Sequence, residues 1–418
     1  RSRGLGDVYK RQTPSRAYTG AVTTSAENSP ASNQPAPGGQ AAPDALTVRP
    51  ITEAEHIEVL RRRPESSFLQ NPAWGRVKVG WRPVSLGFFR GHELVGAALV
   101  LLRRLPVPAK VPFLGRACLA YVSEGPVLDE GVDMLAALEP MVAHLKGEGA
   151  FLVRVGLPGP VRRWEADALR KAIKDPEIGS VLDLEAEVTP GALELQDRLR
   201  AAGWQAPEVG DGFIAGQPMF QARIPLEGLD VDGVLKRMNQ TSRSETRKST
   251  RTDLDVREAG AAGLDEFMQT YTQTAEREGF NGRAKEYFEG VFAELGESPI
   301  ADVDLFLASY EGQPLAGAIA IRQGRFAWYP YGGSATAERK RFAPRALQLQ
   351  QIEAALEAGC HWYDLGGVGP SLDPEHKLAG LMRFKTAIGA DVVQTHGEWE
   401  LPLNKPLAKA FALYLARR

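Results

Sequence analysis

Basic side chains are concentrated in one short segment of a chain whose charges otherwise balance. Residues 236–251 contain six Lys or Arg residues and a single acid, Glu245, which gives the segment a net charge of +5. Arg243, Arg247 and Arg251 recur at intervals of four residues, a spacing that places them on one face of a helix. Such a face suits the binding of phosphate groups or RNA, and a charged face that simply lies in solvent is the alternative interpretation.

A second group of polar side chains is formed by two tyrosines. Tyr329 and Tyr331 are separated by one residue in an aromatic segment that ends in glycines. Alternation along a strand predicts that both point to one side of a sheet, where their hydroxyls could position a substrate or their rings could simply be core. The six histidines show no metal-ligand spacing, and neither a G-x-S-x-G nor a P-loop pattern occurs. We therefore expect chemistry based on cations and hydroxyls, without a metal or redox cofactor.

The overall composition excludes several classes of protein. The 418 residues carry 50 Lys or Arg and 52 Asp or Glu, a net charge of −2, which argues against nucleic-acid binding through global positive charge. Two cysteines, Cys118 and Cys360, are too few for a disulfide framework, so a reducing cytoplasm is expected. The longest apolar run, residues 94–102, is far shorter than the about 20 residues of a membrane span.

The first part of the chain differs from the rest in composition. Residues 1–12 look like a construction or assembly scar. Residues 13–47 include 25 Ala, Pro, Ser, Thr or Gly among 35 positions and only three charged residues. This composition offers too little apolar surface to offset the entropy of ordering the chain. We therefore expect residues 1–47 to form a disordered tail and folded structure to begin at residue 48.

The remaining sequence follows one plan twice. Residues 91–97 and 312–318 both read G-x-x-L-x-G-A between two apolar runs, which predicts two β-hairpins. An aromatic strand ending in glycine follows each hairpin, then a helix (residues 132–146 and 344–357) and another strand (residues 151–155 and 361–365). The sequence therefore predicts an α/β (α+β) fold in which helices pack on two largely antiparallel sheets.

Seven further stretches occur in order between residues 50 and 405. They are residues 69–81 (LQ…WGRVK…W), 125–129 (GPVLD), the basic helix and strand at 244–256, 266–288 (EF…Y…AER-E-GF…R…YF), 328–334 (WYPYGGS), 363–367 (YDLGG) and 384–389 (FK…G). Together they resemble the FemABX family, the aminoacyl-tRNA-dependent transferases that build peptidoglycan cross-bridges. Single motifs of this length are weak evidence, but seven in register are strong.

The resemblance implies a fold of two tandem GNAT-like (acyl-CoA N-acyltransferase-like) domains. It places the first domain at residues 48–205 and the second at residues 206–386, with residues 387–418 packing back on the first. Some members carry a long coiled-coil arm, but no heptad run of that length is present, so an armless type is expected.

The resemblance also implies a reaction. An amine of a peptidoglycan precursor, lipid-linked or nucleotide-linked, would attack the ester of aminoacyl-tRNA, which serves as co-substrate, and no cofactor is implied. The activity would serve cell-wall synthesis in the cytoplasm, with peripheral contact to the inner membrane as an option. A monomer and a homo- or heterodimer both remain open.

Carried over position by position, the resemblance assigns roles to single residues. Lys78 and Arg283 match phosphate-binding residues of the family, and Tyr287 would share a helix face with Arg283. Tyr331 would help to bind substrate, whereas Tyr329 and Lys385 would act at the acyl-transfer point. The tRNA would contact the three arginines of the basic segment. Apolar neighbours predict that Lys385 is partly buried, and Asp364 is expected to cap the glycine turn that follows it.

One departure from the family and two alternatives remain. The family often has an acid where residues 152–158 carry none, so no general base is assigned. An acyl-CoA-dependent GNAT N-acyltransferase is one alternative, although residues 339–346 lack the glycines of a pyrophosphate loop and Pro344 has no N–H. A non-catalytic precursor-binding partner is the other.

Overall fold

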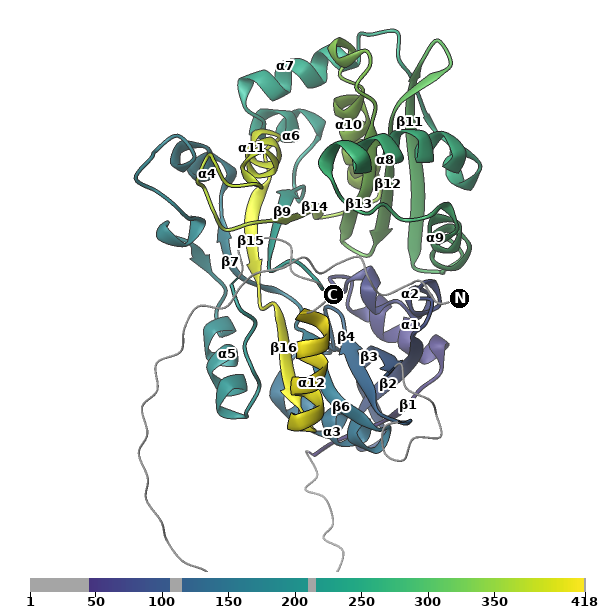
Figure 1. The fold of residues 1–418 in the computed structure, drawn as a ribbon, viewed down its shortest axis with the longest axis vertical. Coiled ribbons are helices and arrows are strands. Elements are labelled where there is room, and N and C mark those ends of the chain that lie inside the picture. Colours follow the sequence, from purple (N-terminus) through teal and green to yellow (C-terminus); the bar gives the residue numbers. More distant parts are fainter. Residues whose placement is uncertain (1–44, 106–114, 210–215, 417–418) are drawn as a thin grey trace, which may run out of the picture.

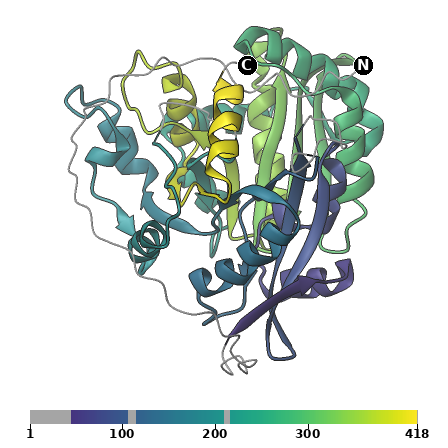
Figure 2. The ribbon, with the colours of Figure 1, turned by 60° about the horizontal axis from the view of Figure 1, so that its bottom comes forward.

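The computed structural model describes residues 45–105, 115–209 and 216–416. Residues 1–44, most of the expected disordered tail, lie outside the described residues. The described chain forms two bodies, each built on a β-sheet with helices against it (Figure 1). Figures 1 and 2 show the purple helices α1 and α2 of the first body beside the green second body. None of the described helices is both long and apolar enough to cross a membrane.

The first body contains a seven-stranded sheet with the order β1-β2-β3-β4-β6-β16, and β5 pairs with β3. Its strands are β1 (Leu46–Pro50), β2 (Arg82–Arg90), β3 (Glu93–Arg104), β4 (Cys118–Val122), β5 (Val127–Leu128), β6 (Ala150–Gly156) and β16 (Glu398–Pro402). Its helices are α1 (Glu53–Arg62), η1 (Phe68–Gln70), α2 (Pro72–Val77), α3 (Met134–Gly147), α5 (Ala192–Ala201) and α12 (Lys405–Ala416).

The second body contains a nine-stranded sheet with the order β10-β11-β12-β13-β14-β9-β15-β7-β8. Its strands are β7 (Pro160–Trp164), β8 (Glu187–Val188), β9 (Phe220–Pro225), β10 (Asp255–Glu258), β11 (Ala301–Tyr310), β12 (Gln313–Gln323), β13 (Phe326–Ser334), β14 (Trp362–Val368) and β15 (Asp391–Thr395). Its helices are α4 (Ala166–Ala172), η2 (Val181–Asp183), α6 (Val231–Arg237), α7 (Gln240–Ser249), η3 (Gly260–Gly263), α8 (Leu264–Glu278), α9 (Lys285–Gly290), η4 (Val291–Leu295), η5 (Arg339–Arg341), α10 (Ala343–Glu357) and α11 (Ala379–Ala387).

The two sheets repeat one topology. In β1-β2-β3-β4-β6 and in β10-β11-β12-β13-β14 the first three pairings are antiparallel and the last is parallel. The hairpins turn at Gly91 and Gly312, whose φ angles of +62° and +77° favour glycine. The predicted α/β plan of tandem GNAT-like domains is therefore confirmed. The longest described helices, α8 and α10, have 15 residues each, so the described chain contains no long coiled-coil arm.

The chain exchanges segments between the bodies. Residues 160–188, which the sequence placed in the first domain, contribute β7 and β8 to the second sheet. At the other end of the chain β15 pairs with β9 and β7 in the second sheet, whereas β16 pairs with β6 in the first. Helix α12 then packs on the first body, with Phe411 against Phe151.

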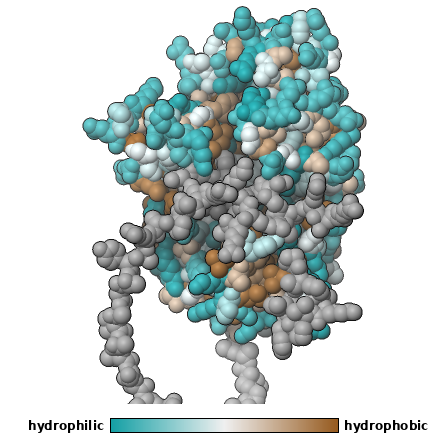
Figure 3. Space-filling view, in the orientation of Figure 1, coloured by the Kyte–Doolittle hydropathy of each residue, from teal (hydrophilic) through white to brown (hydrophobic). Residues whose placement is uncertain are grey.

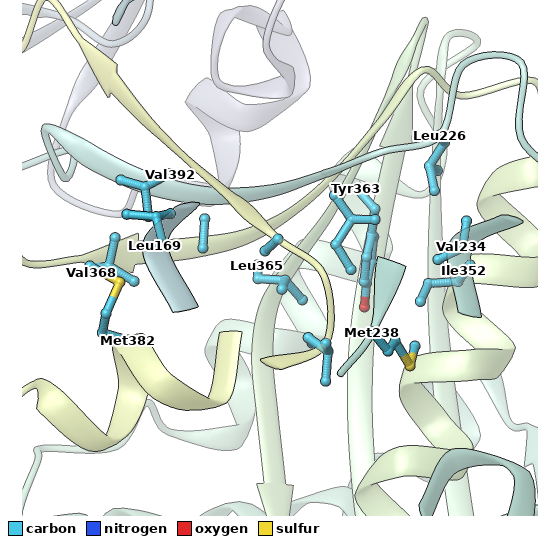
Figure 4. Packing of buried hydrophobic residues seen from close by; sticks show 14 of the residues in the cluster. Leu169, Leu226, Val234, Met238, Ile352, Tyr363, Leu365, Val368, Met382 and Val392 are labelled. Carbon is cyan, nitrogen blue, oxygen red and sulfur yellow. The ribbon is translucent and has the colours of Figure 1, made fainter. Parts of the chain in front are cut away.

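The exchange has its physical basis in the core of the second body. Leu169 of α4 packs with Val392 of β15 and Met382 of α11, and Tyr363 and Leu365 of β14 continue the same cluster (Figure 4). Burial of these side chains favours the arrangement because each large apolar side chain removed from water contributes about 1.5–3 kcal/mol.

The basic segment is folded differently from the prediction of one helical region. It forms two helices, α6 and α7, because the chain is extended at Met238. Asn239 then starts α7 as its N-cap, and its side-chain Oδ1 accepts a hydrogen bond of 2.8 Å from the Ser242 N–H.

Candidate active site

Two cations from different bodies lie against one aromatic ring. Lys78 follows directly after α2, and its Nζ lies 4.1 Å from the ring centroid of Trp74 and 5.9 Å from that of Tyr287. Arg283 comes from the second body, and its guanidinium carbon lies 5.2 Å from the same Tyr287 centroid. The fold therefore brings together two positive charges that are 205 positions apart in the sequence.

The electrostatics of this pair favour an anion. Burial lowers the pKa of Lys78 to about 8, and the nearby Arg283 lowers it further. Within the described ranges, neither side chain makes an ion pair with a carboxylate, whereas most other arginines of the second body do. Two unneutralised cations are costly to hold together, and a phosphate group would offset both charges.

Tyr287 and Tyr331 complete this group. Their hydroxyl oxygens are 2.7 Å apart, and burial raises the pKa of both phenols. The ring of Phe288 packs edge-on against both tyrosines. The prediction that Arg283 and Tyr287 share a helix face is wrong, because the backbone is extended at Ala284 and α9 begins only after it. The Arg283 side chain nevertheless reaches the tyrosine ring from the loop.

Tyr329 lies on the opposite face of the sheet from Tyr331, contrary to the prediction. Ile319 pairs with Tyr331 and Ile321 pairs with Trp328, so β13 has one extra residue between these pairs. Such a bulge reverses the side on which the next side chain points. Tyr329 consequently packs toward α10, and Tyr331 packs toward α8 and α9.

Lys385 is buried in the second body, as its apolar neighbours predicted. Only 6% of the residue is exposed, and its Nζ donates a hydrogen bond of 2.8 Å to the Gly367 carbonyl oxygen. Burial lowers the pKa of Lys385 to about 8, and the charge of Asp364 partly opposes this shift. Asp364 accepts a hydrogen bond from the Gly366 N–H at 2.6 Å, which confirms its expected structural role.

Lys385 and Tyr329 both lie just beyond the point where two parallel strands separate. Strands β13 and β14 are paired from Phe326 to Trp328 on one side and from Trp362 to Asp364 on the other. Tyr329 is the next residue of β13, and it lines a small cavity of about 90 Å³ beside Gln348 of α10. A separation of this kind exposes strand backbone, which can bind an extended substrate.

The three predicted arginines of the basic segment line one surface groove of about 350 Å³. Arg243 and Arg247 project from α7, and Arg251 follows just after the end of the helix. Arg247 is mostly exposed and lies 3.7 Å from Asp232, a distance at which an exposed ion pair is weak. The surface over the helices at the top of Figure 3, which include α7, is largely hydrophilic.

A larger cavity, of about 690 Å³, lies between the two bodies, and the sequence gave no indication of it. Phe326 and Trp328 of β13 form part of its wall with their rings stacked 5.3 Å apart, and Glu124 of the first body forms another part. Trp328 also packs on Phe68, which packs on Trp74, so one aromatic row connects this cavity with the ring under Lys78. The only signal in the sequence was the Gly-Pro segment directly after Glu124.

The fold and these sites define a tandem GNAT-like protein with an anion-binding pair at the junction of its two bodies. A model of the FemAB family matches residues 51–309 and 297–415, which together span most of the chain. This protein therefore belongs to the FemAB family.

Relatives and a solved structure agree with this assignment. The chain is 24% identical to a lipid II:glycine glycyltransferase of Staphylococcus saprophyticus, covering 85% of this chain and 93% of the relative. It is 29% identical to the UDP-N-acetylmuramoylpentapeptide-lysine N(6)-alanyltransferase of Weissella viridescens, covering 76% of this chain and 85% of the relative. The crystal structure of FemX shares the fold, with a TM-score of 0.69 and 22% identity over 87% of this chain and 99% of FemX.

Proposed function

We propose that this protein is an aminoacyltransferase that moves an amino acid from aminoacyl-tRNA to an amine of a peptidoglycan precursor stem peptide. The observation that carries the proposal is the pair of cations, Lys78 and Arg283, held against Tyr287 without a carboxylate partner in the described residues. The names of the relatives support it, since one acts on lipid II and another on the lysine of a UDP-N-acetylmuramoyl pentapeptide.

Lys78 and Arg283 bind the phosphate groups of the precursor in this proposal. Lipid-linked and nucleotide-linked precursors share this anionic element, and the two cations can both contact it because they converge from different bodies. Tyr287 and Tyr331 stabilise the arrangement through their linked hydroxyls. Precursor binding thereby holds the two bodies together across their junction.

Transfer takes place near Lys385 and Tyr329. The amine nitrogen attacks the ester carbonyl carbon, the bond to the ribose oxygen breaks, the new C–N bond forms, and the proton lost by the amine passes to solvent or to the leaving ribose oxygen. The Lys385 ammonium, buried and bonded only to the Gly367 carbonyl, is suited to stabilise the negative charge that develops on the carbonyl oxygen. Tyr329 positions the ester from the neighbouring strand.

The groove of Arg243, Arg247 and Arg251 binds the tRNA backbone in this account. Phosphate contacts of this kind position a nucleic acid without reading its sequence. We propose no cofactor, because the aminoacyl ester is already activated. We place the reaction in the cytoplasm, where aminoacyl-tRNA is available, with peripheral contact to the inner membrane if the acceptor is lipid-linked.

Calorimetric titration with a UDP-N-acetylmuramoyl pentapeptide tests the proposal. Lys78→Met and Arg283→Met should each weaken binding by about tenfold or more, because a hydrogen bond to a charged group contributes about 1.5–3 kcal/mol. Lys285→Met is the matched control, since Lys285 lies on α9 nearby but is exposed and pairs with Asp265 at 2.6 Å. Equal affinities for all four proteins would refute the assignment of the phosphate site.

A further inference from the structure

The cavity of about 690 Å³ between the bodies has a role that the cation pair does not explain. Glu124 lines it from the first body, at the end of β4 and directly before Gly125. Its backbone φ is +49°, a left-handed conformation that side-chain-bearing residues disfavour. The position therefore keeps a glutamate in a strained conformation at the wall of the largest described cavity.

Glu124 differs from the other charged residues of the cavity wall. Each of the other three acids and each of the four arginines has an ionic partner, and only Glu124 among the described lining residues has none. These pairs are Glu65 with Arg325 at 2.8 Å, Asp129 with Arg62 at 3.0 Å, Glu187 with Arg163 at 3.6 Å, Arg63 with Glu130 at 3.6 Å and Arg223 with Asp364 at 2.9 Å. Glu124 accepts one hydrogen bond, from Gln221 Nε2 at 3.2 Å.

The partner of Glu124 places it close to Lys385. Gln221 of β9 is the cross-strand neighbour of Gly367, and the Gly367 carbonyl accepts the hydrogen bond of Lys385 Nζ. Gln221 also accepts a hydrogen bond from Arg223, which pairs with Asp364. The Glu124 carboxylate and the Lys385 ammonium are thus connected through a single pair of residues in the second sheet.

We propose that Glu124 binds the cationic amine of the acceptor side chain and so selects precursors that carry such an amine. This inference rests on the proposed function. A carboxylate without an ionic partner attracts an ammonium group, and the apolar wall formed by Pro126, Leu157 and Val393 suits the aliphatic chain that carries it. The amine would then lie on the cavity side of β14, close to the strand that Lys385 contacts from α11.

The test compares two ligands by calorimetry. One is a lysine-containing UDP-N-acetylmuramoyl pentapeptide, and the other is the same molecule with the lysine N6 acetylated, which removes the charge. Wild-type protein should bind the free-amine ligand about tenfold to hundredfold more tightly than the acetylated one. Glu124→Gln should abolish this preference by weakening the first affinity alone, whereas Glu124→Asp should retain part of it.

Glu187→Gln is the matched control, because Glu187 lines the same cavity but is paired with Arg163. It should keep the wild-type preference. Equal wild-type affinity for both ligands would overturn the inference while leaving precursor binding, and with it the proposed function, intact. Failure of the wild-type protein to bind either ligand would overturn both. The wild-type comparison decides the matter even if a Glu124 variant does not fold.

Discussion

Replacement of Lys385 by methionine should separate stability from activity. The side chain is 94% buried by its 6% exposure, and its ammonium has one hydrogen bond, to the Gly367 carbonyl. Methionine preserves most of the apolar stem and removes the charge. We therefore expect Lys385→Met to abolish most of the transfer activity while the protein folds at least nearly as well as the wild type.

The expected change in stability follows from the pKa of Lys385, which burial lowers from 10.5 to about 8. One pKa unit corresponds to about 1.4 kcal/mol, so the charged lysine destabilises the fold at pH 7 by about 3 kcal/mol. Loss of its hydrogen bond leaves the carbonyl unsatisfied and costs about 1–3 kcal/mol. Lys385→Met should thus range from unchanged to about 2 kcal/mol more stable at pH 7.

The pH dependence provides a sharper result than the value at one pH. Below about pH 8 the lysine is charged in both the folded and the unfolded protein, so the penalty is complete. Between pH 8 and 10.5 the folded protein releases a proton that the unfolded chain keeps, and folding stability rises. The free energy of unfolding of the wild type, relative to Lys385→Met, should therefore increase by about 3 kcal/mol over this range.

Urea unfolding of both proteins at intervals between pH 7 and 10.5 measures this difference. Lys78 has a similarly lowered pKa, but it is present in both proteins, so its contribution cancels. Arg383→Met, on the exposed side of α11, is the control and should show no comparable pH dependence. A flat difference between wild type and Lys385→Met, or normal turnover by the variant, would refute the reasoning.

Two further predictions concern other parts of the second body. Charge reversal at Arg247 and Arg251 should weaken aminoacyl-tRNA binding and flatten its salt dependence, measured by filter binding, whereas Arg90→Glu on the first sheet should not; unchanged affinity would make the α7 groove an ordinary solvated face. Asp391→Ala should destabilise the fold by about 3–5 kcal/mol in urea unfolding, because Asp391 is fully buried and pairs with two arginines. A loss below 1 kcal/mol would contradict that estimate.

The sequence predicted the features that depend on local signals. The glycine turns at Gly91 and Gly312 mark both hairpins, and Gly279 ends α8 in a left-handed conformation with a φ of +70°. Those signals are local because only glycine adopts such angles readily. The burial of Lys385 was likewise predictable, since its neighbours along α11 are apolar.

Features that depend on distant pairing were not predictable. The opposite orientations of Tyr329 and Tyr331 arise from a bulge that exists only because β12 and β13 pair in a particular register. The transfer of β7 and β8 to the second sheet depends on a pairing with β15, which lies more than 200 positions later in the chain. Spacing within one segment carries no information about either.

The site between the bodies shows the same distinction. Lys78 and Arg283 were identified through motifs, but their common contact with Tyr287 requires the two bodies to meet. Glu124 was not identified at all, because its neighbours in the sequence do not reveal a cavity whose opposite wall comes from β13. Its lack of an ionic partner is a property of the assembled fold.

The central claim is transfer of an amino acid from tRNA to a peptidoglycan precursor. Its most direct test supplies purified protein with tRNA charged with labelled amino acids and a UDP-N-acetylmuramoyl pentapeptide, and measures label in the precursor before and after RNase treatment. The account predicts labelled precursor that RNase treatment of the charged tRNA abolishes. Transfer that survives RNase, or that occurs only when an acyl-CoA is added, would contradict it.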